Sequence, residues 1–177
     1  MHIQQVLGSD LAGALEELGD LVRRAGNVAR SAALFEEALQ HVSAGGDAMG
    51  VFRVRGKAAL SRIVGGEVDA AAALLADTLH AMAEAHAGSV PVARTYYLLA
   101  QLRWHSGQYR GALDAAEAAF QAAQAGQDVA DRARAYEAMA LACHSLGDWQ
   151  KGVQYELSRE ALGVPGFAVD EALDVHL

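Results

Sequence analysis

Three arginines recur at one position of a regular pattern. Arg53, Arg94 and Arg134 each lie thirteen residues before one of a set of evenly spaced glycines, and Lys57 follows Arg53 by one helical turn. An arginine side chain donates hydrogen bonds in a rigid planar fork that fits a carboxylate or a phosphate. The column therefore predicts a surface that binds an acidic peptide, a C-terminal carboxylate or a phosphorylated or other anionic ligand.

The same arginines also have a purely structural interpretation. They can form ion pairs with acidic side chains of neighbouring helices, for which Glu36, Asp77 and Glu117 are the candidates. Pairs of this kind would connect successive repeats rather than bind a ligand. The sequence leaves both interpretations open, because both need arginine at the same spacing.

A second group of candidate residues follows Arg94. Tyr97, Gln101, Trp104 and His105 are spaced so that they project from one face of a helix. They predict an aromatic and polar patch beside the arginine, although aromatic residues at this spacing also pack against neighbouring helices. Together the candidate ligand-binding residues are Arg53, Lys57, Arg94, Tyr97, Gln101, Trp104 and Arg134.

Patterns typical of catalytic or metal sites are absent from the sequence. None of the 7 histidines forms the i, i+3 or i, i+4 pair that places two metal ligands on one helical face. The single cysteine, Cys143, is expected to be a small buried hydrophobe. The segment from Gly50 to Lys57 is one residue too long for a phosphate-binding loop, and Ala58 supplies no hydroxyl for magnesium. We therefore expect no enzymatic activity, no metal and no cofactor.

The composition limits both the fold and the partners. Lys+Arg number 14 and Asp+Glu 22, which gives a net charge of −8 and argues against binding to a nucleic acid backbone. Alanine is abundant and proline occurs only 2 times, which favours helix throughout. No apolar run approaches the ~20 residues that span a bilayer, and the N-terminus has no secretion signal pattern. With one cysteine, these features make cytoplasmic the expected location.

Regularly spaced glycines divide the chain into helix-sized segments. Gly26, Gly66, Gly107 and Gly147 are 40, 41 and 40 residues apart, and a second set lies about midway between them. A glycine just after a helix end adopts the left-handed conformation without a Cβ clash. Asp47 and Asp128 stand where an N-cap belongs. The predicted helices are 10–25, 28–43, 48–64, 68–87, 91–106, 109–125, 129–146, 149–162 and 167–177.

The residues around these glycines resemble the tetratricopeptide repeat (TPR) family. The matching residues are Leu15, Leu18–Gly19, Gly26, Ser31, Phe35 and Ala38 in the first unit, Tyr96, Leu99–Ala100, Gly107, Ala112 and Ala119 in the third, and Tyr136, Met139–Ala140 and Gly147 in the fourth. The ~40-residue period exceeds the family's usual length of about 34. It is similar to the long-helix variant in sensor regions of bacterial signalling ATPases and transcriptional regulators.

This resemblance implies an all-α, right-handed α-solenoid of about four helix-turn-helix repeats plus a C-terminal helix. The repeats would be 11–45, 46–88, 89–126 and 127–162, after an N-terminal extension at 1–10. Residues 163–177 would be a capping helix or the start of a fifth repeat, and we favour a fifth repeat in a longer protein. The first helices would line a concave groove, with the arginines along it and Tyr96 and Tyr136 in the core.

The function expected from these observations is a protein–protein interaction module that binds a peptide or protein segment, including an acidic one, in its groove. The resemblance also supports an alternative, which is a domain that senses a small-molecule effector within a bacterial transcriptional or signalling regulator. In both cases the partner is neither nucleic acid nor membrane. Self-association through the ends of the repeat array is compatible with either function.

Overall fold

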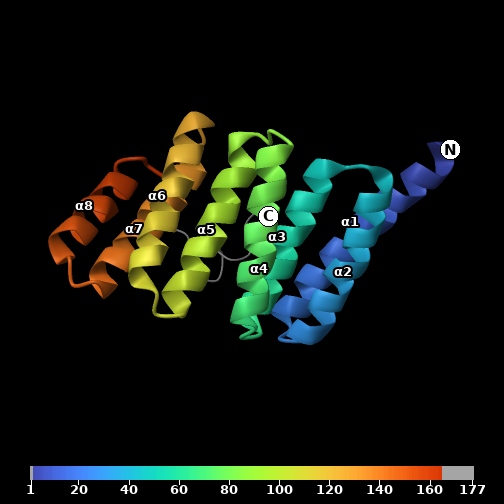
Figure 1. Ribbon diagram of the computed structural model, residues 1–177, viewed down its shortest axis with the longest axis horizontal. Helices are drawn as coiled ribbons and strands as arrows, with labels where there is room; N and C mark the ends of the chain where they lie inside the picture. The colour runs from blue at the N-terminus through green and yellow to red at the C-terminus, as the bar shows by residue number, and fades with distance from the viewer. Residues whose placement is uncertain (1, 165–177) are drawn as a thin grey trace. The chain divides into compact units, whose positions relative to one another are not determined.

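The computed structural model describes residues 2–164, with side chains from residue 10 onward. Over this range it contains eight α-helices and no strand (Figure 1). The helices are α1 His2–Arg24, α2 Val28–Gly45, α3 Ala48–Val64, α4 Val68–Glu84, α5 Ser89–His105, α6 Tyr109–Ala125, α7 Val129–Ser145 and α8 Trp149–Glu160.

The first eight predicted helices are all present, with differences at their ends. The largest difference is at α1, which begins at His2 rather than residue 10, so the expected N-terminal extension continues this helix. Helix α2 runs on to Gly45 because Gly46 is the residue with positive φ, at +73°. The ninth predicted helix, 167–177, lies outside the described residues.

The turns explain why the sequence pattern predicts the helix pairs well. The four evenly spaced glycines all have positive φ, from +73° to +83°. The expected N-caps are confirmed, because the Asp47 carboxylate accepts from the Gly50 N–H at 2.9 Å and Asp128 from the Asp131 N–H at 2.8 Å. Asn27 and Asp148 cap α2 and α8 in the same way, which extends the pattern to two further helices.

The intermediate glycines behave less uniformly. Gly126 has a right-handed φ of −80°, and the left-handed position falls on Gln127 at +57°. Similarly, His86 rather than Gly88 has positive φ, at +50°. The expectation of a left-handed glycine is therefore wrong at these two turns, because α4 ends three residues before the predicted end and α6 retains right-handed geometry through Gly126.

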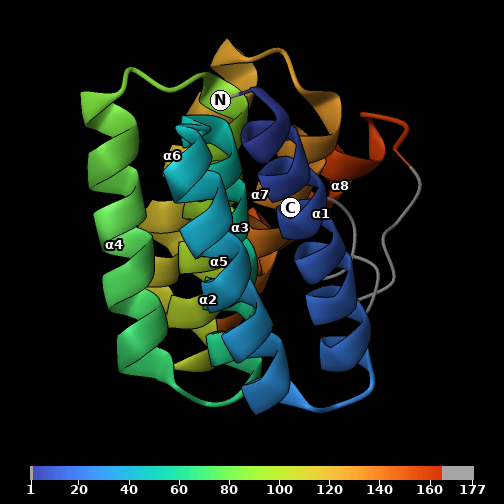
Figure 2. The same ribbon diagram turned by 90° about the vertical axis from the view of Figure 1, so that its right-hand side faces the viewer.

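The described chain divides into two compact units, residues 2–78 and residues 79–164. Consecutive helices pack against each other within each unit, α1 with α2 and α2 with α3 in the first, and α5 through α8 in sequence in the second (Figures 1 and 2). The first helices of adjacent repeats also touch, α1 with α3 and α5 with α7. This second type of contact positions the candidate site.

Small residues allow the helices to approach closely. In the first unit the ring of Phe35 is fully buried and lies directly against Gly19, where an added Cβ would be 2.7 Å from the ring. In the second unit the core is built largely from alanines of α6 and α7, with Met139 and Cys143. Each unit therefore has its own core. Burial of one large apolar side chain in such a core stabilises the fold by about 1.5–3 kcal/mol.

Candidate functional site

The first unit joins α1 to α3 through a cluster of four charged side chains. Arg53 donates from Nε and Nη2 to the two carboxylate oxygens of Glu16, at 3.0 and 2.8 Å. One turn further along, Lys57 Nζ lies 2.7 Å from an Asp20 oxygen and 3.4 Å from Glu16. Each first helix thus carries its charged residues in register with those of its neighbour.

The electrostatics of this cluster favour the ionised pair. Burial by itself would raise the pKa of Glu16, but the hydrogen bond and charge of Arg53, together with those of Lys57, outweigh burial and lower that pKa. The hydrogen bond to Glu16 in turn raises the pKa of Arg53. Both groups are therefore charged at neutral pH.

The second unit contains a similar ion pair, but here the arginine is on the earlier of the two first helices and the carboxylate is on the later one. Arg94 on α5 donates from Nε to an Asp131 oxygen on α7, at 3.3 Å. Arg134, on α7 itself, donates to the other oxygen of the same carboxylate. Asp131 lies in the first turn of α7, where its own N–H is capped by Asp128. One buried carboxylate thus holds two of the three arginines in the column.

Arg53 and Arg94 do not pair with the carboxylates that the sequence suggested. Their partners lie on first helices, whereas Glu36, Asp77 and Glu117 lie on second helices. Glu36 pairs instead with Arg62 at 2.8 Å, and Glu117 with Lys151 at 3.7 Å. The reason is geometric, because this column faces the neighbouring first helix, a contact that the spacing within one helix does not reveal.

The two partners of each pair differ sharply in exposure. The side chains of Glu16 and Asp131 are only 5% and 4% exposed, whereas those of Arg53 and Arg94 are 44% and 31% exposed. The described residues supply no acceptor for Nη1 of Arg53 or for either terminal nitrogen of Arg94. Solvent therefore meets guanidinium groups whose orientation is fixed by carboxylates beneath them. Arg134 is buried and does not belong to this exposed set.

The aromatic candidates next to Arg94 occupy different places from those expected. Tyr97 belongs to the core, and burial, followed by the charge of Glu137, raises its pKa to about 12. Tyr96, the expected core residue, is only partly buried at the edge of that core. The two tyrosines exchange roles because α5 is covered by α7 as well as by α6.

Gln101 and Trp104 complete the set of sequence candidates. Gln101 is half-buried. The indole nitrogen of Trp104 donates to the Ser145 hydroxyl on α7 at 2.9 Å, and its ring meets His105 edge-on at 5.0 Å. Trp104 thus connects two first helices, while His105 stays exposed beside it.

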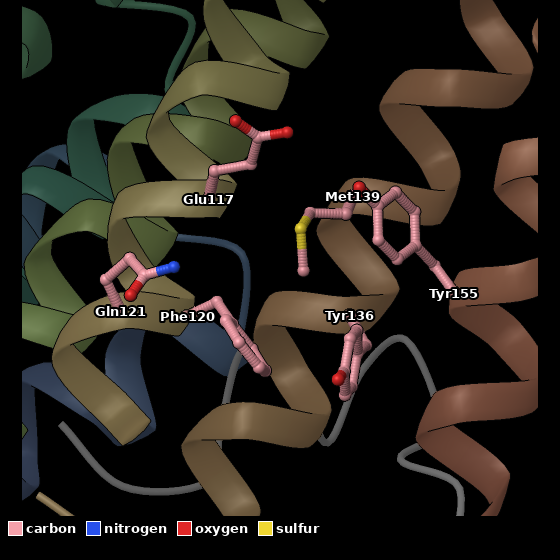
Figure 3. Close-up of a pocket in the computed structure, with 6 residues that line it drawn as sticks. All are labelled: Glu117, Phe120, Gln121, Tyr136, Met139 and Tyr155. Atoms are coloured by element: carbon pink, nitrogen blue, oxygen red, sulfur yellow. The ribbon is translucent and has the colours of Figure 1, made fainter. Parts of the chain in front are cut away.

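Helices α6, α7 and α8 border an open cavity of about 290 Å³ that the sequence does not predict. Figure 3 shows its six lining side chains, namely Glu117, Phe120 and Gln121 from α6, Tyr136 and Met139 from α7, and Tyr155 from α8. The ring of Tyr136 lies 4.8 Å from that of Phe120 and 6.1 Å from that of Tyr155. Tyr136, also expected in the core, is only partly buried at its edge and lines this cavity.

Histidine and cysteine residues do not assemble a metal site in the described part of the chain, where no three His, Cys, Asp or Glu side chains converge. Cys143 is buried, and burial raises the pKa of its thiol. His144 stacks on Trp149 at 5.1 Å. Among these residues no helix is both long and apolar enough to cross a bilayer.

Solved structures with the same fold include TPR-like repeats. The crystal structure of BtubC (BKLC) from P. vanneervenii matches with a TM-score of 0.73 and 21% identity over 86% of this chain. The match covers 63% of BtubC, so this chain spans less than two thirds of that protein. The nearly identical TPR-like repeats of a Podosopora anserina putative kinesin light chain match with a TM-score of 0.56 and 16% identity, over 88% of this chain and 96% of theirs.

These likenesses confirm the fold that the repeat pattern predicts, an all-α solenoid of TPR-like helix pairs. No protein-family model and no curated protein matches the chain. At identities of 21% and below, the likeness extends to the fold and not to individual binding residues. The chain is accordingly a helical-repeat protein with this fold.

Proposed function

We propose that this chain is a protein–protein interaction module that binds acidic peptide or protein segments at the first helices of its repeats, within each of its two units. The observation that carries the proposal is the exposure of Arg53 and Arg94 above carboxylates that are themselves buried. Each arginine retains donors that point away from its internal partner. A carboxylate from another chain can bind these donors without displacing Glu16 or Asp131.

The internal ion pairs favour binding because they hold the arginine side chains in a fixed orientation before a partner arrives. A flexible side chain that becomes fixed at an interface costs about 0.5–1.5 kcal/mol. Arg53 is already fixed by two hydrogen bonds and Arg94 by one, so much of this cost is met when the protein folds. The internal carboxylates also lower the net positive charge around each arginine. We therefore expect affinity to depend on directed hydrogen bonds more than on long-range attraction.

The test is to replace the guanidinium fork while the positive charge is kept. In the double variant Arg53→Lys, Arg94→Lys, each lysine still neutralises its buried carboxylate, but the planar donor pair is lost. We expect the variant to keep its helical content and to bind acidic peptides from a peptide array roughly tenfold more weakly, about 1.4 kcal/mol for two lost forks. Fluorescence anisotropy with the best acidic peptide gives the affinities.

The matched control is Arg30→Lys, Arg110→Lys, which makes the same chemical change at exposed positions on the second helices α2 and α6. This control should bind like the wild type. Equal binding by all three proteins would remove the first-helix arginines from recognition. Recognition would then lie elsewhere on the repeats.

A further inference from the structure

The cavity between α6, α7 and α8 has the chemistry of a cation site. Its wall contains the row of rings formed by Phe120, Tyr136 and Tyr155, and the carboxylate of Glu117 lies at its edge. The face of an aromatic ring attracts a cation through its quadrupole, and a nearby carboxylate adds a full negative charge. We propose that this cavity, which is distinct from the exposed side chains of Arg53 and Arg94, binds a lysine side chain of a basic partner segment.

The protein places an ammonium group of its own beside two of the residues that line the cavity. Lys151 on α8 has its Nζ 5.5 Å from the centre of the Tyr155 ring and 3.7 Å from a Glu117 oxygen. Both charged side chains are nearly half exposed, at 41% and 48%, so the ion pair is weak and exchanges readily with a competitor. Lys151 therefore shows which chemical group the site accepts, and it also competes with an incoming cation.

The size of the cavity and the charge of Glu117 select the occupant. At about 290 Å³, the cavity lies just below the usual range for pockets that hold a whole small ligand or cofactor. It has room for one long side chain. The carboxylate of Glu117 at the cavity repels an acidic side chain and attracts a basic one.

The competing role of Lys151 provides a test in which two variants change affinity in opposite directions. The probe is a short fluorescein-labelled oligolysine, titrated with the full chain and followed by fluorescence anisotropy. We expect Lys151→Gln to bind about threefold more tightly than wild type, because the internal competitor is gone. We expect Glu117→Gln to bind several-fold more weakly, and Phe120→Leu about threefold more weakly because one ring is lost while the apolar volume is kept.

Matched controls separate the effect of the cavity residues on affinity from the effect of the net charge of the protein. Arg30→Gln changes the net charge as Lys151→Gln does, and Glu37→Gln matches Glu117→Gln, but both lie exposed on α2. Equal effects within either pair would overturn the proposal, as would wild-type affinity in Phe120→Leu. Thermal unfolding confirms that Phe120→Leu folds, and the exposed Lys151 position gives a second measurement that does not perturb the core.

A small free cation tests whether the ammonium group that binds the cavity belongs to a partner's lysine side chain or to a small molecule. Tetramethylammonium should displace oligolysine from wild type, with weaker displacement from Phe120→Leu. Binding of tetramethylammonium without any binding of oligolysine would overturn the proposal of a protein partner in favour of a small cation. The Arg53→Lys, Arg94→Lys variant should bind oligolysine normally, so failure here and failure of the acidic-peptide proposal are separate results.

Discussion

Two glycines on α1 should respond in opposite directions to the same substitution. An added Cβ at Gly19 would lie 2.7, 2.9 and 3.1 Å from three ring carbons of Phe35, whereas a Cβ at Gly13 would meet nothing within 4 Å. Phe35 is fully buried, and Lys57 Nζ lies 6.0 Å from its ring centre. Displacement of this ring would therefore disturb both the core of the first unit and the charged cluster above it.

The magnitudes follow from two opposing effects. Alanine in place of glycine in a helix interior stabilises by up to about 1 kcal/mol. Extra volume in a well-packed core costs about 1–3 kcal/mol, and the fully buried ring of Phe35 has little freedom to yield. We expect Gly19→Ala to lower the free energy of unfolding by about 1–2 kcal/mol and Gly13→Ala to raise it by about 0.5–1 kcal/mol.

Urea denaturation followed by circular dichroism measures both values on the full chain. The double variant Gly19→Ala, Phe35→Leu tests the cause, because the smaller side chain removes the clash and makes the two substitutions non-additive. Stabilisation by Gly19→Ala, or strict additivity of the double variant, would refute the close packing of Phe35 on α1.

Three further predictions concern a turn, an ion pair and the thiol. Gln127→Gly should raise the midpoint of thermal unfolding, because a non-glycine residue at a φ of +57° costs about 1–2 kcal/mol; a lower midpoint would contradict this. The Glu16 carboxyl has a pKa below its ordinary 4.5, so its contribution to stability is complete above that pH and is lost as the pH falls through the lowered value. Wild type and Glu16→Gln should therefore differ most near neutral pH and converge in acid, as denaturation across pH measures. Cys143 should react with a thiol reagent many-fold faster after unfolding than before, and equal rates would show that the thiol is accessible in the fold.

Much of the fold is predictable because backbone conformation limits which residues a turn accepts. Gly26, Gly66, Gly107 and Gly147 all adopt the left-handed conformation that disfavours other residues, so their spacing predicts the helix pairs. At the turn after α6 this reasoning fails by one residue, because the left-handed position falls on Gln127.

The candidate site is less predictable because it depends on contacts between helices. The arginine column is visible in the sequence, but the choice of Glu16 and Asp131 as partners follows from contact between first helices, which no spacing within one helix reveals. Likewise, periodicity cannot tell Tyr96 from Tyr97 on a helix that is covered on two sides. The cavity depends on the shapes of side chains on α6, α7 and α8 that meet there.

Helix α7 contributes to both proposed sites and explains how one repeat can present two opposite chemistries. Asp131 and Arg134 face α5, where the buried carboxylate orients Arg94. Tyr136 and Met139 face the cavity beside α6 and α8. Because helical periodicity turns these two pairs toward different neighbours, donors for an acidic segment and rings for a basic one are held by the same backbone. A partner with clustered charges of both signs could therefore engage both sites.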